Sequence, residues 1–392
     1  MLRRSLLTAT ALSAARILGA NDKIRVAVIG TGARGRFLTR EFKEFGAVVS
    51  TVCDVYEPNL ARGLKAASTG AKPCHDYRRA LEDSAVDAVI IATPDHWHAK
   101  MTVDALDAGK DVYVEKPMAN SIADGFRMVE AVRRTRRVLQ VGTQRRSSEL
   151  FIDAARVVRS GRAGVVRLVN SWWLDKYPGV ERAQLTGKLD WKQWLRPAPD
   201  HALDPRRFFH WLWYWDYSAG FIPGWGSHIV DEIHMLMGST APLAVTCAGG
   251  GVYTEGTEVP RTTCMITEYP ENYLAVFTAA GESMHYNFVK DQLIQIHGTK
   301  ARLDVGREVY RLFPQSDALE VEPALDVHMP RSFAAATSIH IRNFLDCIRS
   351  RTDPNGTVEM GQSATIVMCM ARDSLRSGRR LRWNPRTRKV ES

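Results

Sequence analysis

The stretch IRVAVIGTGARGRFLTREF, residues 24–42, decides the fold of the first half of this chain. Its opening, IRVAVIG, is a short apolar run rich in β-branched residues, which is typical of a buried parallel strand. The run GTGARG follows at 30–35, and a segment with helical periodicity comes next. A strand, a glycine turn and a helix in this order are the context in which G-x-G-x-x-G indicates a dinucleotide-binding motif.

Each glycine of this motif has a distinct physical role. Gly30 permits the tight turn, Gly32 lets the backbone approach a pyrophosphate, and Gly35 lets helix and strand pack closely. The second predicted strand, AVVSTVCD at 47–54, ends in Asp54. A carboxylate there accepts hydrogen bonds from the adenosine ribose and repels a 2′-phosphate, so the sequence predicts NAD rather than NADP.

The same alternation of strands and helices continues to about residue 145. Further apolar runs lie at 87–94, 110–117 and 137–144, with helical segments between them. This pattern predicts a doubly wound parallel sheet with helices on both faces. Ligands of such sheets bind beyond the carboxyl ends of the strands, which is where TPDHWH, EKP and GTQ fall.

After Arg145 the pattern changes. A chain of 392 residues suggests two domains. A predicted helix at 149–161 is followed by short strands separated by turns, and two helices precede the C-terminus, which favours an α/β domain with an antiparallel sheet. The predicted strands lie at 165–173, 243–249, 263–269, 272–280, 292–298 and 301–306.

The two ends of the chain carry much of its positive charge, which is +10 overall. MLRRSLLTATALSAARILGA, residues 1–20, resembles a twin-arginine export signal and predicts a periplasmic or otherwise exported protein; the alternative is a cytosolic leader. We expect the basic run at 372–389 to be a solvated tail. A nucleic-acid or membrane surface is the alternative, but no nucleic-acid motif supports it, so nucleic acid is not an expected partner.

Several other classes of protein are not indicated. No apolar run beyond the leader reaches the ~18 residues needed to span a bilayer, so no integral membrane segment is expected. The six cysteines form no CxxC pair, so neither a disulfide framework nor a zinc site is predicted. In DHWH, at 95–98, two histidines lie two residues apart. Contact with a cofactor or substrate is the preferred reading, since a metal would need a further ligand that the sequence does not identify.

These motifs together resemble the Gfo/Idh/MocA oxidoreductases, named for glucose–fructose oxidoreductase, inositol dehydrogenase and a rhizopine-catabolism protein. The matching elements are IGTGARG, Asp54, ATPDHWHA, YVEKPMA, VGTQ and WGSHIVD, spread over about residues 22–385, and EKP is the most specific. The resemblance implies an NAD(P)-binding domain at 22–145 and a substrate-binding and oligomerisation domain at 146–385. It further implies that the second domain has an open, mostly antiparallel sheet, that a sugar or polyol binds between the domains, and that the chain forms a homo-oligomer.

Lys116 of EKP matches the catalytic lysine of that family. A lysine at the carboxyl end of a strand can hydrogen-bond a reacting hydroxyl and stabilise the developing alkoxide, and burial lowers its pKa. The alternative reading is a surface ion pair with Glu115. We expect Glu115 to orient Lys116 or to contact the cofactor.

His228 opens the H-x-x-D segment of WGSHIVD. Asp231 lies three residues later, close to it around a helix, where a carboxylate can orient the imidazole of a general base. A histidine at a helix start is otherwise more often structural; the family pattern favours catalysis here. Many relatives carry a carboxylate or amide four residues before this histidine, where this chain has Gly224. A second polar substrate contact is therefore missing here or supplied from elsewhere.

Eight of the ten tryptophans fall between Trp172 and Trp225. They predict either a surface that stacks on sugar rings or an aromatic plug that buries apolar area. Trp97 and Trp225, which adjoin the motifs, are the expected ligand contacts.

The sequence leaves three functions open. The first is NAD(P)-dependent hydride transfer at a carbinol carbon of a sugar, glycoside or polyol. The second is NAD-dependent glycoside cleavage with tightly bound NAD, which suits an exported enzyme without a free supply of cofactor. The third is non-catalytic binding of NAD or sugar. The expected residues are, for catalysis, Lys116, His228 and Asp231; for the cofactor, Gly30, Thr31, Gly32, Ala33, Arg34, Gly35, Asp54, Thr93, Pro94, His98, Glu115, Lys116 and Gln144; and for the substrate, Trp97, Trp225 and His228.

Overall fold

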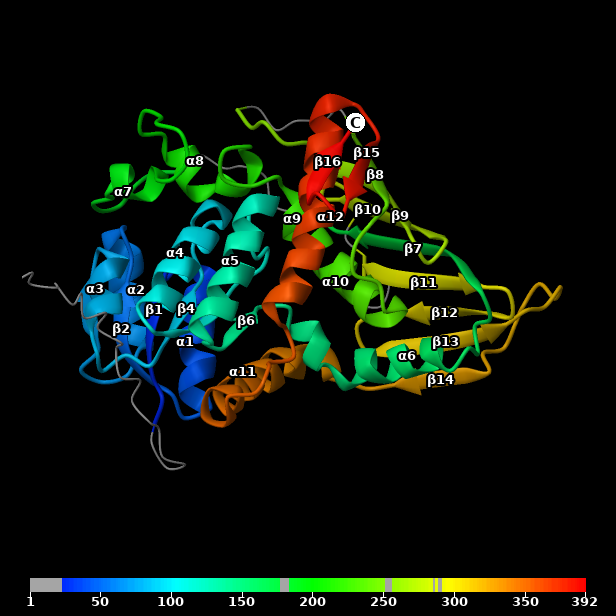
Figure 1. The fold of residues 1–392 in the computed structure, drawn as a ribbon, viewed down its shortest axis with the longest axis horizontal. Coiled ribbons are helices and arrows are strands. Elements are labelled where there is room, and N and C mark those ends of the chain that lie inside the picture. The colour runs from blue at the N-terminus through cyan, green and yellow to red at the C-terminus, as the bar shows by residue number, and fades with distance from the viewer. Residues whose placement is uncertain (1–22, 177–182, 251–255, 285, 288–290) are drawn as a thin grey trace, which may run out of the picture.

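The computed structural model describes residues 23–176, 183–250, 256–284, 286–287 and 291–392, so the predicted export signal at 1–20 lies outside the described residues. The described chain builds two sheets, which lie on either side of helix α12 (Val358–Ser377) in Figure 1. One sheet is parallel and the other is mostly antiparallel. The predicted α/β fold class is therefore confirmed.

The first sheet has the strand order β3-β2-β1-β4-β5-β6, and each neighbouring pair is parallel. The strand order reverses between β1 and β4, because the chain builds the sheet outward from β1 to β3 and then continues on the other side of β1 with β4. Sheets of this kind bind dinucleotides at that point. The strands are β1 (Arg25–Ile29), β2 (Val48–Cys53), β3 (Lys72–Cys74), β4 (Ala88–Ile91), β5 (Asp111–Val114) and β6 (Leu139–Val141). The helices are α1 (Ala33–Glu44), α2 (Glu57–Ala66), α3 (Tyr77–Glu82), α4 (Asp95–Asp107) and α5 (Ile122–Thr135).

The second sheet has the order β14-β13-β12-β11-β7-β10-β9-β8-β15-β16, in which only β7 and β10 pair in parallel among the described residues. Its strands are β7 (Val166–Leu174), β8 (Ala244–Gly249), β9 (Thr262–Tyr269), β10 (Tyr273–Ala280), β11 (Gln292–Gly298), β12 (Ala301–Val305), β13 (Val309–Pro314), β14 (Leu325–His328), β15 (Leu381–Asn384) and β16 (Lys389–Glu391). Helices α6 (Glu149–Arg159), α10 (Gly226–Met237) and α12 contribute to the apolar core beneath it.

Helix α11 (Ser332–Ser350) follows strand β14 of the second sheet in sequence but packs against the first sheet. The ring of Phe344 lies 6.1 Å from that of Phe42 on α1 and 5.8 Å from that of Tyr113 on β5, and all three are fully buried. The expected domain at 146–385 therefore contributes a helix to the core of the first domain. The apolar run at 138–141 gives no sign of this partner, since it comes some 200 residues later in the chain.

His340 of α11 supplies a prediction about pH. Its Nε2 lies 2.8 Å from the carbonyl oxygen of Val141 and its Nδ1 2.8 Å from Oγ of Ser147, and burial lowers its pKa to about 4. Between pH 6.5 and about 4, His340 binds a proton in the unfolded chain but not in the folded chain. The free energy of unfolding therefore falls as the pH drops through this range. In His340→Asn, we expect the free energy of unfolding, measured with urea across this range, to fall less steeply by up to about 1.4 kcal/mol per pH unit. Equal slopes in the two proteins would contradict this.

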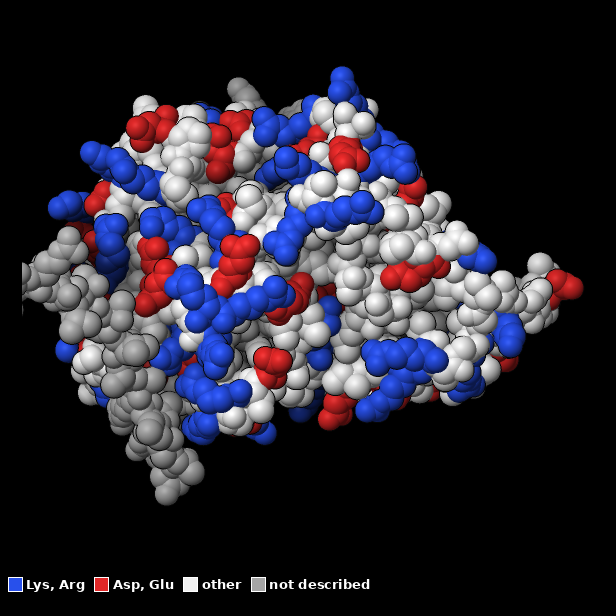
Figure 2. Space-filling view, in the orientation of Figure 1, with Lys and Arg blue, Asp and Glu red and all other residues white. Residues whose placement is uncertain are grey.

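The basic run at 372–389 is not the solvated tail that we expected. It completes α12 and forms β15, whose alternate residues Leu381 and Trp383 are buried, and β15 pairs with β8. Arg380 meets Glu268 through two hydrogen bonds of 2.6 Å. Acidic and basic side chains are interspersed on the face shown in Figure 2, where basic ones prevail. The excess charge is thus spread over folded surface.

Three further short helices, α7 (Trp191–Leu195), α8 (Pro205–Phe209) and α9 (Phe221–Gly224), come from the tryptophan-rich segment. In Figure 1, α7 and α8 lie over the first domain, at the upper left. A turn of 3₁₀ helix, η2 (Trp211–Trp213), follows α8, and another, η1 (Gln144–Ser147), links the two domains. No helix in the described part of the chain is long and apolar enough to cross a bilayer.

Candidate active site and cofactor cavity

The glycine loop has the geometry that its sequence predicts. Gly30 has φ of +84°, and a Cβ there would lie 2.7 Å from the carbonyl oxygen of Ala92. A Cβ on Gly35 would overlap the carbonyl oxygen of Gly30. A Cβ on Gly32, by contrast, would meet nothing within 4 Å, because this glycine borders an open cavity. Helix α1 begins at Ala33, so its first N–H groups lie beside that space.

Asp54 closes the loop from the end of β2. Its Oδ2 accepts hydrogen bonds from the backbone N–H (2.7 Å) and the hydroxyl (3.2 Å) of Thr31, and its Oδ1 accepts one from the N–H of Tyr56 (2.9 Å). Burial raises the pKa of this carboxyl, although these hydrogen bonds oppose the change. Asp54 also lines the cavity, where the remaining lone pairs of its carboxylate can accept hydrogen bonds from hydroxyl groups.

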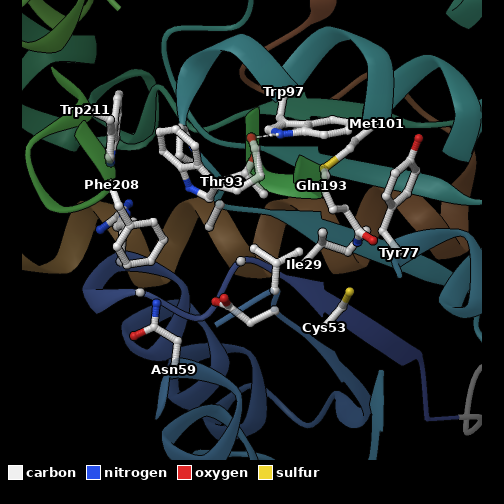
Figure 3. A pocket seen from close by; sticks show the side chains of 18 of the residues that line it. Ile29, Cys53, Asn59, Tyr77, Thr93, Trp97, Met101, Gln193, Phe208 and Trp211 are labelled. Carbon is white, nitrogen blue, oxygen red and sulfur yellow. Dashed lines mark hydrogen bonds between the residues drawn. The ribbon is translucent and has the colours of Figure 1, made fainter. Parts of the chain in front are cut away.

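A cavity of about 650 Å³ extends from Asp54 past the ends of β1 and β4 (Figure 3). The first domain contributes the glycine loop, Asn59, Thr93 and Pro94 to its wall. Thr93 has a buried hydroxyl with no hydrogen-bond partner among the described residues, and the buried side-chain oxygen of Gln144, at the start of η1, also has none there. The open glycine cradle, the helix start and the carboxylate fit a dinucleotide. When bound, NAD supplies a hydride acceptor.

Lys116 lies at the end of β5 and reaches into the second domain. Its Nζ donates a hydrogen bond of 2.7 Å to the carbonyl oxygen of Gly224. Burial lowers the pKa of Lys116, and the carboxylates of Glu115 and Asp95 oppose that change. Gly224, which has no polar side chain, thus binds Lys116 through its backbone carbonyl oxygen. The alternative of a surface ion pair does not hold, because Glu115 pairs instead with Arg34, at 2.6 Å.

His228, in the first turn of α10, is buried and surrounded by positive charge. Burial lowers its pKa well below 6.5, and Lys116, Arg145, Arg34 and Arg307 add to this effect. The imidazole is therefore neutral at neutral pH and can accept a proton. Its Nδ1 is buried with no hydrogen-bond partner among the described residues.

The structure does not pair Asp231 with His228. Both carboxylate oxygens of Asp231 accept from Nε of Arg146, at 2.7 and 2.9 Å. Ten of the twelve residues of α10 are buried. The buried carboxylate of Asp231 therefore pairs with the cation of Arg146 and not with His228 on its own helix. Asp231 joins α10 to η1 through Arg146, and the structure does not show the contact with His228 that we expected from H-x-x-D.

Two of the other expected contacts also have protein partners. The ring nitrogens of His98 lie 2.7 Å from the carbonyl oxygen of Pro117 and 2.9 Å from that of Thr93. This histidine links the TP and EKP turns, and its contact with the cofactor stays a prediction. The guanidinium of Arg34 likewise turns to Glu115, although Arg34 and Ala33 line the cavity.

The tryptophans form mostly packing contacts. Trp225 stacks between Trp173 and Phe221, with ring centres 5.0 and 3.6 Å away. Trp97 is buried in the wall of the cofactor cavity, where its Nε1 donates to the carbonyl oxygen of Trp194 at 2.8 Å. The residues of the plug that joins the two domains are Tyr56, Trp194, Leu195, Phe208, Tyr214 and Tyr217. Of the two predicted roles, the plug is the one that the packing supports for this group.

Sequence reasoning missed Asp95 and the cavity wall supplied by the second domain. Oδ2 of Asp95 accepts a hydrogen bond of 2.5 Å from Oγ of Ser218, and burial raises its pKa to about 6. Its place directly after Thr-Pro, at the end of a predicted strand, was a signal for it. Phe208, Phe209 and Trp211 also line the cavity, and no motif pointed to them. The described residues contain no cluster of three or more histidines, cysteines and acids that could hold a metal.

A Rossmann domain joined to a second sheet, with a lysine and a neutral histidine where they meet, defines a nucleotide-dependent oxidoreductase fold. A profile of the oxidoreductase family with an NAD-binding Rossmann fold matches residues 24–143, and one of the Gfo/Idh/MocA C-terminal domain matches 151–304. The chain belongs to the Gfo/Idh/MocA family, and its first domain is an NAD-binding domain.

Several known proteins are similar to parts or all of the chain. Inositol 2-dehydrogenase 1 of Saccharopolyspora erythraea is 32% identical over 151 residues, covering 38% of this chain and 44% of that protein. Glycosyl hydrolase family 109 protein 2 of Shewanella sp. is 38% identical over 125 residues, covering 30% and 27%. The matches thus span about half or less of these relatives.

Solved structures resemble the whole fold. Levoglucosan dehydrogenase in complex with NADH and levoglucosan has a TM-score of 0.73 at 16% identity, covering 92% of this chain and 99% of that one. The WlbA dehydrogenase from Bordetella pertussis, in complex with NADH and UDP-GlcNAcA, has a TM-score of 0.71 at 20% identity, covering 93% and 99%. At these identities the likeness concerns the fold.

Proposed function

We propose that this protein is an NAD-dependent oxidoreductase that oxidises a carbinol carbon of a sugar, glycoside or polyol. The proposal is carried by Lys116, held on the carbonyl oxygen of Gly224, and by a buried, neutral His228 whose pKa is lowered by burial and by the nearby charge of Lys116. Oxidation of an alcohol releases a hydride and a proton, and these two side chains can handle the oxygen and the proton. The names of inositol 2-dehydrogenase and levoglucosan dehydrogenase support a substrate of this class.

The two side chains divide the work. Lys116 hydrogen-bonds the substrate oxygen and stabilises the negative charge that develops on it. We assign to His228, whose imidazole is neutral before the reaction, the acceptance of the hydroxyl proton. Asp95 and Glu115, the carboxylates that favour the charged form of Lys116, keep the ammonium available as a donor.

The test is a panel of sugars, glycosides and polyols offered to the purified full-length protein with NAD. We expect at least one compound to raise the absorbance of the NADH band, with an oxidised product that mass spectrometry identifies. If the protein binds NAD and a sugar tightly but no compound is oxidised, the non-catalytic reading replaces the proposal.

A second candidate function, NAD-dependent glycoside cleavage, is favoured by the similarity to a family 109 glycosyl hydrolase. Oxidation beside a glycosidic bond acidifies the neighbouring C–H, so elimination, hydration and re-reduction can cleave the bond without the usual pair of carboxylates. The same panel separates the two, because cleavage releases an alcohol from a glycoside without net accumulation of NADH.

We also propose, from the sequence of residues 1–20, that the protein is exported by the twin-arginine route. A homo-oligomer stays a prediction. Leu168, Ile266 and Leu274 of the second sheet are partly exposed apolar side chains, at 37%, 41% and 44%, and would suit such contacts.

A further inference from the structure

The tryptophan-rich segment 186–224, called here the cofactor strap, runs along the whole cofactor cavity. At its start it joins the loop between β2 and α2. The N–H of Glu57 donates to the carbonyl oxygen of Lys188 (3.0 Å), and the N–H of Asp190 donates to that of Val55 (3.0 Å). The hydroxyl of Tyr56 accepts a hydrogen bond of 2.9 Å from the N–H of Thr186. These contacts lie beside Asp54, at the adenosine end.

The middle of the strap is fixed to the opposite side of the cavity. The carbonyl oxygen of Trp194 lies 2.8 Å from Nε1 of Trp97 and 3.1 Å from Nε2 of His96, two residues in the first turn of α4. The side chain of Gln193 donates a hydrogen bond of 2.5 Å to the carbonyl oxygen of His75, just after β3. The strap therefore bridges the two sides of the cavity.

The end of the strap reaches the catalytic lysine. Ser218 donates to Asp95, the carboxylate whose charge acts on Lys116, and the carbonyl oxygen of Gly224 accepts directly from Lys116. One continuous segment thus connects the loop that holds Asp54 to the residue that we propose to bind the reacting oxygen.

Between these anchors, the strap presents aromatic rings to the cavity. Phe208 and Trp211 lie across from Asn59 in Figure 3. Phe208 is itself supported by Tyr56 and Trp194, whose ring centres are 5.0 and 5.7 Å away. Phe208 is therefore packed from behind by these two rings as it faces the cavity.

We propose that the strap is the outer half of the NAD site and that it slows the release of the cofactor. Release would require lifting the strap, which breaks its contacts with both sides of the cavity and with Lys116. The site is then competent for catalysis only while the cofactor is enclosed. The inference rests on the proposed function only in taking NAD as the occupant of the cavity.

The experiment measures cofactor retention and not activity. The full-length protein is passed through gel filtration in buffer without nucleotide, its NAD content is measured by mass spectrometry, and exchange with isotope-labelled NAD is then followed. We expect the wild-type protein to keep NAD through gel filtration and to exchange it slowly with the labelled NAD.

Trp211→Ala and Phe208→Ala remove rings that face the cavity. Contacts between an aromatic ring and a base contribute about 1–3 kcal/mol, so we expect exchange to be about 5- to 150-fold faster in each variant. Trp215→Ala is the matched control, because Trp215 lies on the same strap but packs against the second-domain core. It should exchange at the wild-type rate. Thermal unfolding checks that each variant is folded.

Two results would overturn the inference. One is loss of NAD from the wild-type protein during gel filtration, and the other is equal exchange rates in wild-type protein and folded Trp211→Ala. Failure of the proposed function looks different. Rapid exchange together with oxidation of a polyol rejects the strap alone, whereas retained NAD that no panel compound reduces rejects the dehydrogenase alone.

Discussion

Lys116→Met is expected to lower kcat by about 10²- to 10⁴-fold while leaving NAD in place. The substitution keeps the length of the side chain but removes the ammonium that donates to Gly224 and that would hold the reacting oxygen. The measurement is steady-state oxidation of the best compound of the panel, with the NAD content of each preparation determined by mass spectrometry.

Two companion variants sharpen this test. Lys100→Met removes an exposed lysine of α4 that pairs with Asp104, and it should leave kcat unchanged. His228→Ala should also lower kcat, because it removes the neutral base. Normal turnover by both Lys116→Met and His228→Ala would contradict the assigned roles.

The second large effect concerns the glycine loop. Gly35→Ala should lower the free energy of unfolding by about 3 kcal/mol or more, because the new Cβ overlaps the carbonyl oxygen of Gly30. Gly32→Ala is the matched control for folding, because its Cβ would meet nothing within 4 Å. Chemical denaturation of both variants measures the difference.

Gly32→Ala should nevertheless weaken NAD binding. Its methyl group occupies the open side of the loop, where the backbone meets the pyrophosphate, and loss of one hydrogen bond to a charged group corresponds to about 10- to 100-fold in affinity. Titration calorimetry on cofactor-free protein gives the comparison. A Gly32→Ala protein that binds NAD like the wild type would place the pyrophosphate elsewhere.

The parallel sheet was predictable because its signals are local. Each of its longer strands is an apolar run bounded by a turn, and the glycine loop fixes the first crossover. The edge strand β3 (Lys72–Cys74) was missed, since it has three residues and includes a proline. The strand β15 was missed because its two buried residues, Leu381 and Trp383, are separated by charge and surrounded by arginines.

Site residues that come directly after a strand in the sequence were predicted. Partners that lie far apart in the sequence were not. Lys116 and His228 are in the region where the two domains meet, as the motifs suggested. The partner of Asp231 could not be found from helix spacing, because Arg146 comes from an element 85 residues earlier in the sequence. The backbone role of Gly224 was equally hidden, since a carbonyl oxygen has no sequence signature.

Helix α11 has a consequence for how the chain is made. Phe42 of α1 and Tyr113 of β5 form an apolar face of the first domain that Phe344 covers, and the ribosome adds Phe344 about 200 residues after β6. At about 5–20 residues per second, this apolar face waits roughly 10–40 s for its cover. A nascent chain cut off near residue 145 would expose it permanently. The first domain is therefore a poor candidate for independent expression, and newly made chains would be natural clients for a chaperone.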